Sequence, residues 1–221
     1  YNAPEGPGAW GLITGPDGKV YLGTWDGGLI LRFDPRQAQK GIEVVGSPSP
    51  SETYLWQFAL GKDGKLYACT YPQAKLVSFD PSTGKMDDLG RMHPTEMYAR
   101  SVAAGPNGKV YVGIGTTKGD LVVFDPTTRT HRSILPDGLR GNPAWNTVGV
   151  ARRSDGLVYA TYGTNLLRID DETVTSVATA PDVPPLKLRD GRVVTAFGRG
   201  TFSLSDPATG KVVERTFKYA G

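Results

Sequence analysis

The sequence predicts an all-β fold made of repeated four-stranded units, and two observations carry that prediction. The first is an Asp-Gly or Asn-Gly turn that recurs five times, at intervals of 46, 44, 48 and 35 residues. The second is a Phe-Asp-Pro marker that begins at Phe33, Phe79 and Phe124 and is degenerate in the last two repeats. Four strands in each repeat of about 44 residues are typical of a β-propeller blade. We therefore predict a five-bladed β-propeller of antiparallel blades.

The second repeat shows how each blade is assembled. Its first strand is WQFALG from Trp56, and the turn at Asp63-Gly64 joins it to KLYACTY. Asp-Gly and Asn-Gly tolerate the positive φ that tight hairpin turns require. The third strand, AKLVSFD, ends at Pro81, which has no N–H to donate to a neighbouring strand. A second turn then leads to KMDDLG, the fourth strand.

These repeats divide the chain into five predicted blades within one domain, residues 1–221. The blades cover approximately residues 9–50, 51–94, 95–140, 141–180 and 181–221. Five blades can close a ring. The opening segment YNAPEGPG nevertheless resembles the connection from a preceding blade, so part of a larger propeller is the alternative.

Composition limits the classes of partner. The formal net charge is +3, from 25 basic and 22 acidic residues, and no basic run indicates nucleic-acid binding. No apolar stretch reaches the 18 residues expected of a membrane-spanning helix. Cys69 is the single cysteine, so no internal disulfide can form. We expect a monomer of bacterial origin. The sequence constrains the location only weakly, and an extracellular or periplasmic one is favoured.

The repeat also carries a family resemblance. The segments GPDGKVYLGT and LILRFDP resemble blades of the bacterial propeller superfamily that includes NHL-like, quinoprotein-like and SMP-30/gluconolactonase-like proteins. The resemblance covers the whole chain and implies the blade rather than a chemistry. Glu5-Gly6-Pro7 is similar to the segment with which SMP-30-like proteins supply a metal-binding glutamate. It implies a metal-dependent lactonase as one alternative, with Glu5 and Asn146 as candidate ligands for Ca²⁺ or another divalent cation. Otherwise no cofactor is expected.

Residues that recur in every blade are interpreted as structural. One position of the second strand is tyrosine in four blades, and we expect these rings to pack between blades: Tyr21, Tyr67, Tyr111 and Tyr159. Cys69 aligns with Gly23 and Gly113, so it is predicted to be a small buried residue rather than a nucleophile.

Function is expected instead where blades differ. The connections from fourth to first strands and from second to third strands emerge on one face of a propeller, and here they are long and unequal. We predict a ligand-binding surface on this face, formed by Trp10, Trp25, Tyr54, Trp56, Tyr71, Lys75, Tyr98, Arg100, Lys118, Trp145, Asn146, Tyr162 and Arg199. An apolar patch bordered by polar groups is typical of binding sites.

The chemistry of this face favours a small molecule or glycan as ligand. Aromatic rings stack on the faces of sugars, and Arg and Lys pair with carboxylates, so an acidic carbohydrate suits it best. The alternative is that the rings fill the channel of a small propeller. Charged groups such as Glu52, Glu96 and His93 among them argue against a simple plug, because burying unpaired charge is costly.

Two further functions stay open. His93, Tyr98 and Arg100 are candidate catalytic residues of a polysaccharide lyase that acts on uronic-acid glycans. Arg would neutralise the carboxylate, while His and Tyr would move the protons. A lyase needs these three groups to converge on one cavity. A protein-interaction scaffold, the other alternative, needs no such arrangement.

Overall fold

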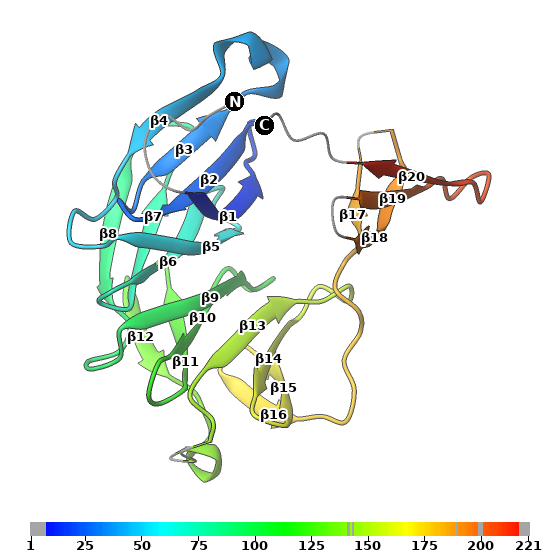
Figure 1. Ribbon diagram of the computed structural model, residues 1–221. Coiled ribbons are helices and arrows are strands. Elements are labelled where there is room, and N and C mark those ends of the chain that lie inside the picture. The colour runs from blue at the N-terminus through cyan, green and yellow to red at the C-terminus, as the bar shows by residue number, and fades with distance from the viewer. Residues whose placement is uncertain (1–7, 141, 143, 189, 199–200, 217–221) are drawn as a thin grey trace. The chain divides into compact units, whose positions relative to one another are not determined.

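The chain folds into five four-stranded antiparallel blades, as the repeats predict. The computed structural model describes residues 8–140, 142, 144–188, 190–198 and 201–216 (Figure 1). Within these residues the regular elements are twenty β-strands and two short 3-10 helices. Every strand pairs antiparallel with its neighbours. This is the four-stranded blade architecture of a β-propeller.

Each blade is built from four consecutive strands. The first two blades contain β1 (Gly8–Thr14), β2 (Val20–Trp25), β3 (Ile30–Phe33) and β4 (Ile42–Gly46), then β5 (Tyr54–Leu60), β6 (Leu66–Tyr71), β7 (Lys75–Phe79) and β8 (Met86–Arg91). The third and fourth contain β9 (Tyr98–Ala104), β10 (Val110–Gly115), β11 (Asp120–Asp125) and β12 (Thr130–Ser133), then β13 (Val148–Arg152), β14 (Val158–Tyr162), β15 (Asn165–Asp170) and β16 (Thr173–Ser176). The fifth contains β17 (Leu186–Lys187), β18 (Val193–Gly198), β19 (Thr201–Ser205) and β20 (Val212–Thr216). The 3-10 helices are η1 (Pro35–Lys40) and η2 (Asp137–Leu139).

The chain divides into two compact units, Tyr1–Pro181 and Asp182–Gly221. The first holds β1 to β16, drawn from blue to yellow in Figure 1, and the second holds β17 to β20. Within the first unit, the first strands of successive blades are neighbours in the order β1, β5, β9 and β13. A single residue pair, Trp25 with Tyr54, joins the first two blades into one sheet.

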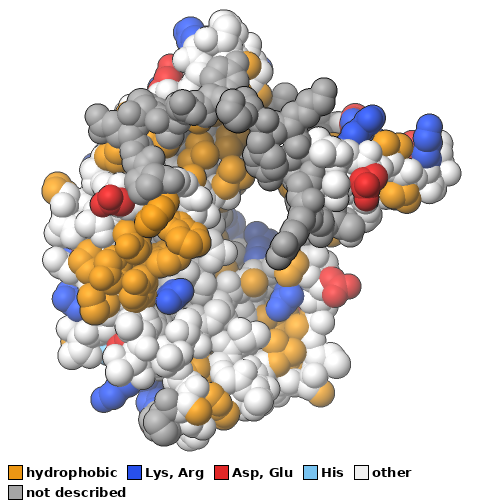
Figure 2. All heavy atoms as spheres, in the orientation of Figure 1, with side chains coloured by type: hydrophobic (Ala, Val, Ile, Leu, Met, Phe, Trp, Pro, Cys, Tyr) orange, Lys and Arg blue, Asp and Glu red, His pale blue; other side chains and the backbone are white. Residues whose placement is uncertain are grey.

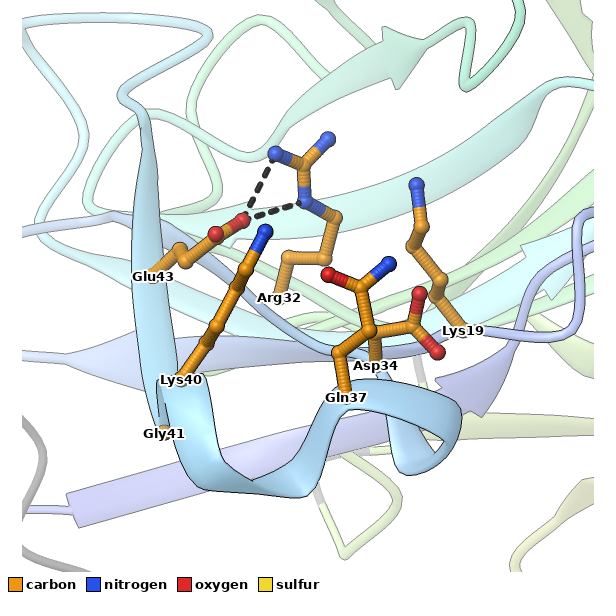
Figure 3. Close-up of a pocket in the computed structure, with 7 residues that line it drawn as sticks. All are labelled: Lys19, Arg32, Asp34, Gln37, Lys40, Gly41 and Glu43. Carbon is orange, nitrogen blue, oxygen red and sulfur yellow. Dashed lines mark hydrogen bonds and ion pairs between the residues drawn. The ribbon is translucent and has the colours of Figure 1, made fainter.

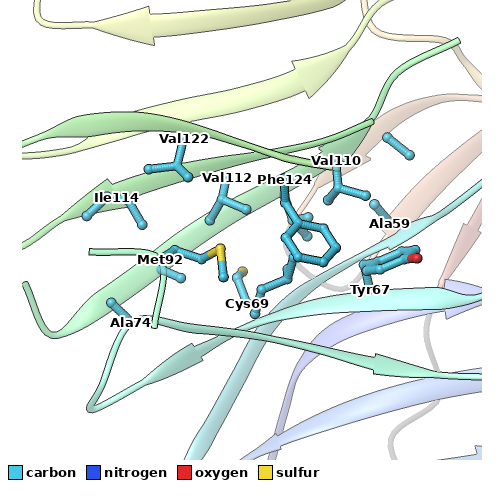
Figure 4. Packing of buried hydrophobic residues seen from close by; sticks show 14 residues of the cluster. Ala59, Tyr67, Cys69, Ala74, Met92, Val110, Val112, Ile114, Val122 and Phe124 are labelled. Atoms are coloured by element: carbon cyan, nitrogen blue, oxygen red, sulfur yellow. The ribbon is translucent and has the colours of Figure 1, made fainter. Parts of the chain in front are cut away.

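The hydrophobic core of the first unit lies between blades rather than at one centre. Three buried clusters fill the spaces between the first and second, the second and third, and the third and fourth blades. Figure 4 shows the middle cluster, in which Phe124 and Val112 of the third blade pack against Tyr67 and Cys69 of the second. A blade is apolar on both faces because each face is covered by a neighbour. Burial of apolar surface between blades therefore stabilises the whole unit.

The repeated tyrosines also fix the hairpin turns. In the first blade the Asp17 carboxylate accepts the backbone N–H of Lys19 at 3.2 Å and the hydroxyl of Tyr21 at 3.0 Å. The second and fourth blades repeat this arrangement with Asp63–Tyr67 and Asp155–Tyr159. All four tyrosines are at most 6% exposed. The expectation that these rings pack between blades is confirmed for Tyr21, Tyr67 and Tyr111. In the three blades with a turn aspartate, the tyrosine hydroxyl is satisfied by the turn itself.

The third blade has asparagine in place of the turn aspartate, and its tyrosine bonds differently. The Asn107 amide donates to the Tyr111 hydroxyl, which in turn donates to the carbonyl of Asp171 at 2.7 Å. The same asparagine donates to the Asp171 carboxylate at 2.9 Å. Lys109 forms ion pairs with Asp171 and Glu172. This substitution links the third blade to the fourth.

Cys69 is fully buried and packs as a small core residue. Its thiol faces the carbonyl of Gln57 at 3.7 Å, and burial raises its pKa to about 12. The equivalent glycines lie against the next blade. A Cβ on Gly23 would be 2.6 Å from Leu55 Cβ, and one on Gly113 would be 2.1 Å from a backbone oxygen. Close approach of neighbouring blades explains the small residues at this position.

Candidate functional site

A row of aromatic rings crosses the first three blades where their second strands end and their first strands begin. Trp25 at the end of β2 pairs with Tyr54, which starts β5, and Tyr54 pairs with Tyr71 at the end of β6. Tyr98 starts β9 and pairs with Gly115 at the end of β10. The row therefore ends in the third blade, where glycine replaces the aromatic residue.

A second row lies on the first strands. The Trp10 ring is 4.7 Å from the Trp56 ring, centroid to centroid, with the planes tilted by 43°. The Arg100 guanidinium lies 5.0 Å from the centre of the Trp56 ring and 4.7 Å from that of Tyr98. Arg100 thus takes the position in the third blade that tryptophan holds in the first two. Its contacts have the geometry of cation–π interactions.

We call the seven residues of both rows the aromatic patch: Trp10, Trp25, Tyr54, Trp56, Tyr71, Tyr98 and Arg100. Figure 2 shows hydrophobic side chains gathered over the second blade, with a basic side chain at the border. Trp10 is 54% exposed and Trp25 36%, while the other rings are partly exposed. Seven of the thirteen predicted ligand-binding residues are therefore brought together on one surface.

Ring stacking decides which faces are accessible. Tyr71 is sandwiched between Tyr54 at 4.8 Å and Tyr98 at 4.2 Å, with interplanar angles of 28° and 27°. These faces cover one another, so the most exposed ring surfaces belong to Trp10 and Trp25. The two tryptophans meet edge to face, with centroids 6.3 Å apart at 70°. They present two differently oriented apolar surfaces to solvent.

Arg100 supplies the charge of the patch. Its side chain is exposed, and no carboxylate among the described residues forms an ion pair with it. Burial raises the pKa of Tyr98, and the nearby Tyr71 and Tyr54 phenols add to this rise while Arg100 opposes it. Tyr98 is therefore a neutral hydroxyl rather than a phenolate at neutral pH. The patch combines neutral rings with one cation available to an anion.

Two glutamates that the sequence places on this face, Glu52 and Glu96, are instead buried and hold a loop by hydrogen bonds. We call these two residues the loop clamps. The Glu52 carboxylate, 2% exposed, accepts the Thr70 hydroxyl at 2.6 Å and the Gln73 N–H at 3.1 Å. Glu96, 4% exposed, accepts the Thr117 N–H at 2.8 Å. Each glutamate thus holds the loop after the second strand of its own blade. The common separation of 21 residues between glutamate and loop amide is the sequence signal for this role.

Lys75 and His93 are likewise held by local bonds. Lys75 pairs with Asp88 at 2.7 Å and donates to Ser49 and Ser51. The His93 Nδ1 accepts the backbone N–H groups of Thr95 and Glu96 at 3.3 and 3.0 Å. Both residues therefore organise loops. Charged groups among the rings argued against a purely structural filling of the channel. That argument now depends on Arg100, since Glu52, Glu96, Lys75 and His93 all have local hydrogen-bond or ion-pair partners.

Tyr162 does not face the patch. It is 1% exposed, and its hydroxyl donates to the carbonyl of Trp145 at 2.9 Å. Its ring meets the Trp145 ring at 5.5 Å. Counted from the turn glycine, Tyr162 stands one residue before the position of Trp25 and Tyr71. Because side chains alternate along a strand, this single step turns the ring into the core.

The other predicted site residues lie outside the patch. Lys118 and Asn146 are exposed in loops of the third and fourth blades. Arg199 and Glu5 lie outside the described residues, so the Glu5-Asn146 metal site stays a prediction. Among the side chains that are described, no group of three or more His, Cys, Asp or Glu could hold a metal ion. No described helix is long and apolar enough to cross a membrane.

Comparison with known proteins supports the fold. No family model and no curated protein matches the chain. Among solved structures it is similar to virginiamycin B lyase from Staphylococcus aureus, with a TM-score of 0.56 and 16% identity over 96% of this chain and 71% of that one. An auxiliary nutrient-binding protein from Bacteroides thetaiotaomicron has a TM-score of 0.60 and 12% identity over 95% and 57% of the two chains. A protein assigned as a gluconolactonase has a TM-score of 0.57 and 13% identity over 97% and 80%. These likenesses establish a β-propeller fold and include both an enzyme and a binding protein.

Proposed function

We propose that this protein is a ligand-binding propeller that recognises a carbohydrate at the aromatic patch, with a preference for acidic sugars. One observation carries the proposal: two exposed tryptophans share one continuous aromatic surface with an arginine that has no ion-pair partner in the described part of the chain. Exposed apolar patches with a few convergent polar groups are typical of binding sites.

The geometry assigns a part to each group. Trp10 and Trp25 offer ring surface to the apolar face of a sugar. Arg100 lies next to Trp56, which also contacts Trp10, so one ligand can cover Trp10 and reach the guanidinium. Guanidinium groups pair with carboxylates through two parallel hydrogen bonds, which gives direction as well as affinity. The stacked tyrosines contact Trp25 and Trp56 and so connect the two rows of the patch.

Binding is favoured over a lyase reaction by the bonds of His93. Its Nδ1 accepts two backbone N–H groups, which holds the ring in the loop. Three of the best-formed cavities among the described residues are lined by none of His93, Tyr98 and Arg100. These two observations favour binding, and the lyase stays an alternative.

The test is thermal unfolding against neutral and uronic-acid-containing oligosaccharides, each with and without a chelator. A ligand that binds only the native state raises the free energy of unfolding by mass action, by about 2.7 kcal/mol when its concentration is a hundred times its Kd. The Tm rises accordingly. The wild-type chain is compared with Trp10→Ala and Arg100→Gln. Matched controls are Val44→Ala, an exposed apolar residue on β4, and Lys62→Gln, an exposed cation in a turn.

We expect an acidic oligosaccharide to stabilise the wild type and both controls. Trp10→Ala should abolish the shift for all sugars, whereas Arg100→Gln should remove only the preference for acidic ones. If the patch variants respond as the controls do, the site lies elsewhere. No shift with any sugar would favour a scaffold. A loss of stability on adding the chelator would favour the metal-dependent lactonase instead.

A further inference from the structure

The first blade differs from the others at the connection between its third and fourth strands. The second, third and fifth blades make a tight turn there, in the sequences PSTGK, PTTRT and PATGK. The first blade instead inserts η1, which contains an internal kink at Gln37 with φ −133° and ψ 45°. A departure from a repeat is where a specific site is most expected, because the fold itself does not require it.

The insertion borders a cavity of about 180 Å³ that is open to solvent. It is lined by Lys19, Arg32, Asp34, Gln37, Lys40, Gly41 and Glu43. Figure 3 shows Gln37 and Lys40 extending from η1 toward Arg32 and Glu43, with Lys19 on the other side. Sites for drug-sized ligands are commonly about 300–1,000 Å³, so this cavity suits a compact ligand.

The charges of the lining are only partly balanced. The Glu43 carboxylate receives two hydrogen bonds from Arg32, at 3.1 and 2.8 Å. Asp34 accepts the backbone N–H and the Nε of Arg36 at 2.9 and 3.3 Å. Both carboxylates therefore have an arginine partner, and Lys19 has Asp17 at 3.4 Å.

Lys40 is the cation of the lining that forms no ion pair with any described residue. The side-chain hydrogen bond from Arg32 lowers the pKa of Glu43, and the positive charge of Lys40 adds to this effect at longer range, so this carboxylate stays ionised and paired with Arg32. Three cations and two ionised carboxylates leave one positive charge in excess. The Gln37 amide and the remaining N–H groups of Lys19 are further donors.

We propose that this cavity is a binding site for a small oxyanion, a carboxylate or a phosphate, held by Lys40, Lys19 and Gln37. Lys40 provides the charge that has no ion-pair partner among the described residues. Gln37 on the same short helix provides a hydrogen bond, and Lys19 provides hydrogen bonds from the other side of the cavity. Hydrogen bonds between ionised partners are about twice as strong as neutral ones. The site is distinct from the aromatic patch. Lys19 precedes β2 and Trp25 ends it, which separates them by about 20 Å along an extended strand.

The second blade supplies a matched control. Lys65 holds the same turn position as Lys19 and pairs with Asp63 at 3.6 Å, as Lys19 does with Asp17. Lys85 lies in the connection that η1 replaces, with its side chain 69% exposed. The double variant Lys19→Ala/Lys40→Ala therefore removes the same number of charges as Lys65→Ala/Lys85→Ala, but only the first alters the cavity.

The experiment titrates inorganic phosphate and, separately, malonate into each protein at constant ionic strength, with chloride as reference, and follows the Tm. We expect one or both anions to stabilise the wild type and the second-blade variant equally. Half-saturation should require about tenfold or more anion in the Lys19/Lys40 variant, the loss typical of a charged hydrogen bond. Which anion acts tells phosphate from carboxylate recognition. The proposal fails if all three proteins respond alike, which indicates general screening, or if neither anion stabilises the wild type.

Discussion

Replacing Glu52 with alanine should destabilise the first compact unit and loosen the loop that follows Tyr71. The carboxylate is almost fully buried and accepts hydrogen bonds from the Thr70 hydroxyl, the Gln73 N–H and the Ser51 hydroxyl. An alanine provides no acceptor, so the Gln73 N–H loses its partner. A buried donor without a partner costs more than the bond itself contributes.

The expected magnitude follows from these contacts. The Thr70 hydroxyl also lies 3.1 Å from the carbonyl of Lys75 and can turn to it, so its loss is partly recovered. Among the described residues, the Gln73 N–H makes no second hydrogen bond. Loss of one charged hydrogen bond and a share of another amounts to about 3 kcal/mol. In a unit of this size that lowers the Tm by roughly 6–12 °C.

Thermal unfolding and amide hydrogen exchange provide the readout. Glu96→Ala should cost less, because a single N–H donor, that of Thr117, depends on it. Glu43→Ala is the control, since its ion pair with Arg32 is exposed and such pairs contribute about 0–1 kcal/mol. Exchange of the Gln73 amide should accelerate in Glu52→Ala alone. A Tm within about 1 °C of wild type, or unchanged protection of Gln73, would refute the clamp.

Three further predictions test other parts of the structure. Cys69 should resist alkylation in the native state at pH 8 and react on unfolding, because burial raises its pKa to about 12. Gly23→Ala should cost about 1–3 kcal/mol by chemical denaturation, since its Cβ would lie 2.6 Å from a neighbouring side chain, whereas Gly138→Ala, which has open space, should be nearly neutral. Burial alone would raise the pKa of Asp88, but hydrogen bonds led by Lys75 lower it overall. The stability that this carboxylate contributes is thus present above its unfolded pKa near 3.8 and is lost as pH falls through the folded value, and Lys75→Met should flatten that loss in acid titrations of the Tm.

The fold was predictable because its determinants are local and repeated. An Asp-Gly turn, a tyrosine in the second strand and a small residue two positions later each occupy a fixed place in the repeat. Their physical reasons are equally local: positive φ in the turn, a hydroxyl satisfied by the turn aspartate, and close approach of the next blade. Repetition reveals such rules without any knowledge of long-range contacts.

The site was only partly predictable, since exposure depends on which face a side chain takes. The register that groups Trp25 with Tyr71 also shows that Tyr162 is one residue off, and one step in a strand reverses the side chain. Glu52 and Glu96 look like surface charges in the sequence. Their role is visible only once the loop amides that they hold are seen in space. Residue type suggested binding, whereas the bonding partner decided between a site residue and a structural one.

This distinction also explains how a repeat protein can vary its sites without losing its fold. The two proposed sites occupy opposite ends of β2, and neither uses the buried residues that every blade shares. The patch ends where Gly115 replaces an aromatic residue, and the cavity exists only where η1 replaces a tight turn. Both are changes at positions that the inter-blade core does not need. Substitutions in the patch or the cavity should therefore alter binding with little change in Tm, while substitutions of the clamps and the packed glycines should do the reverse.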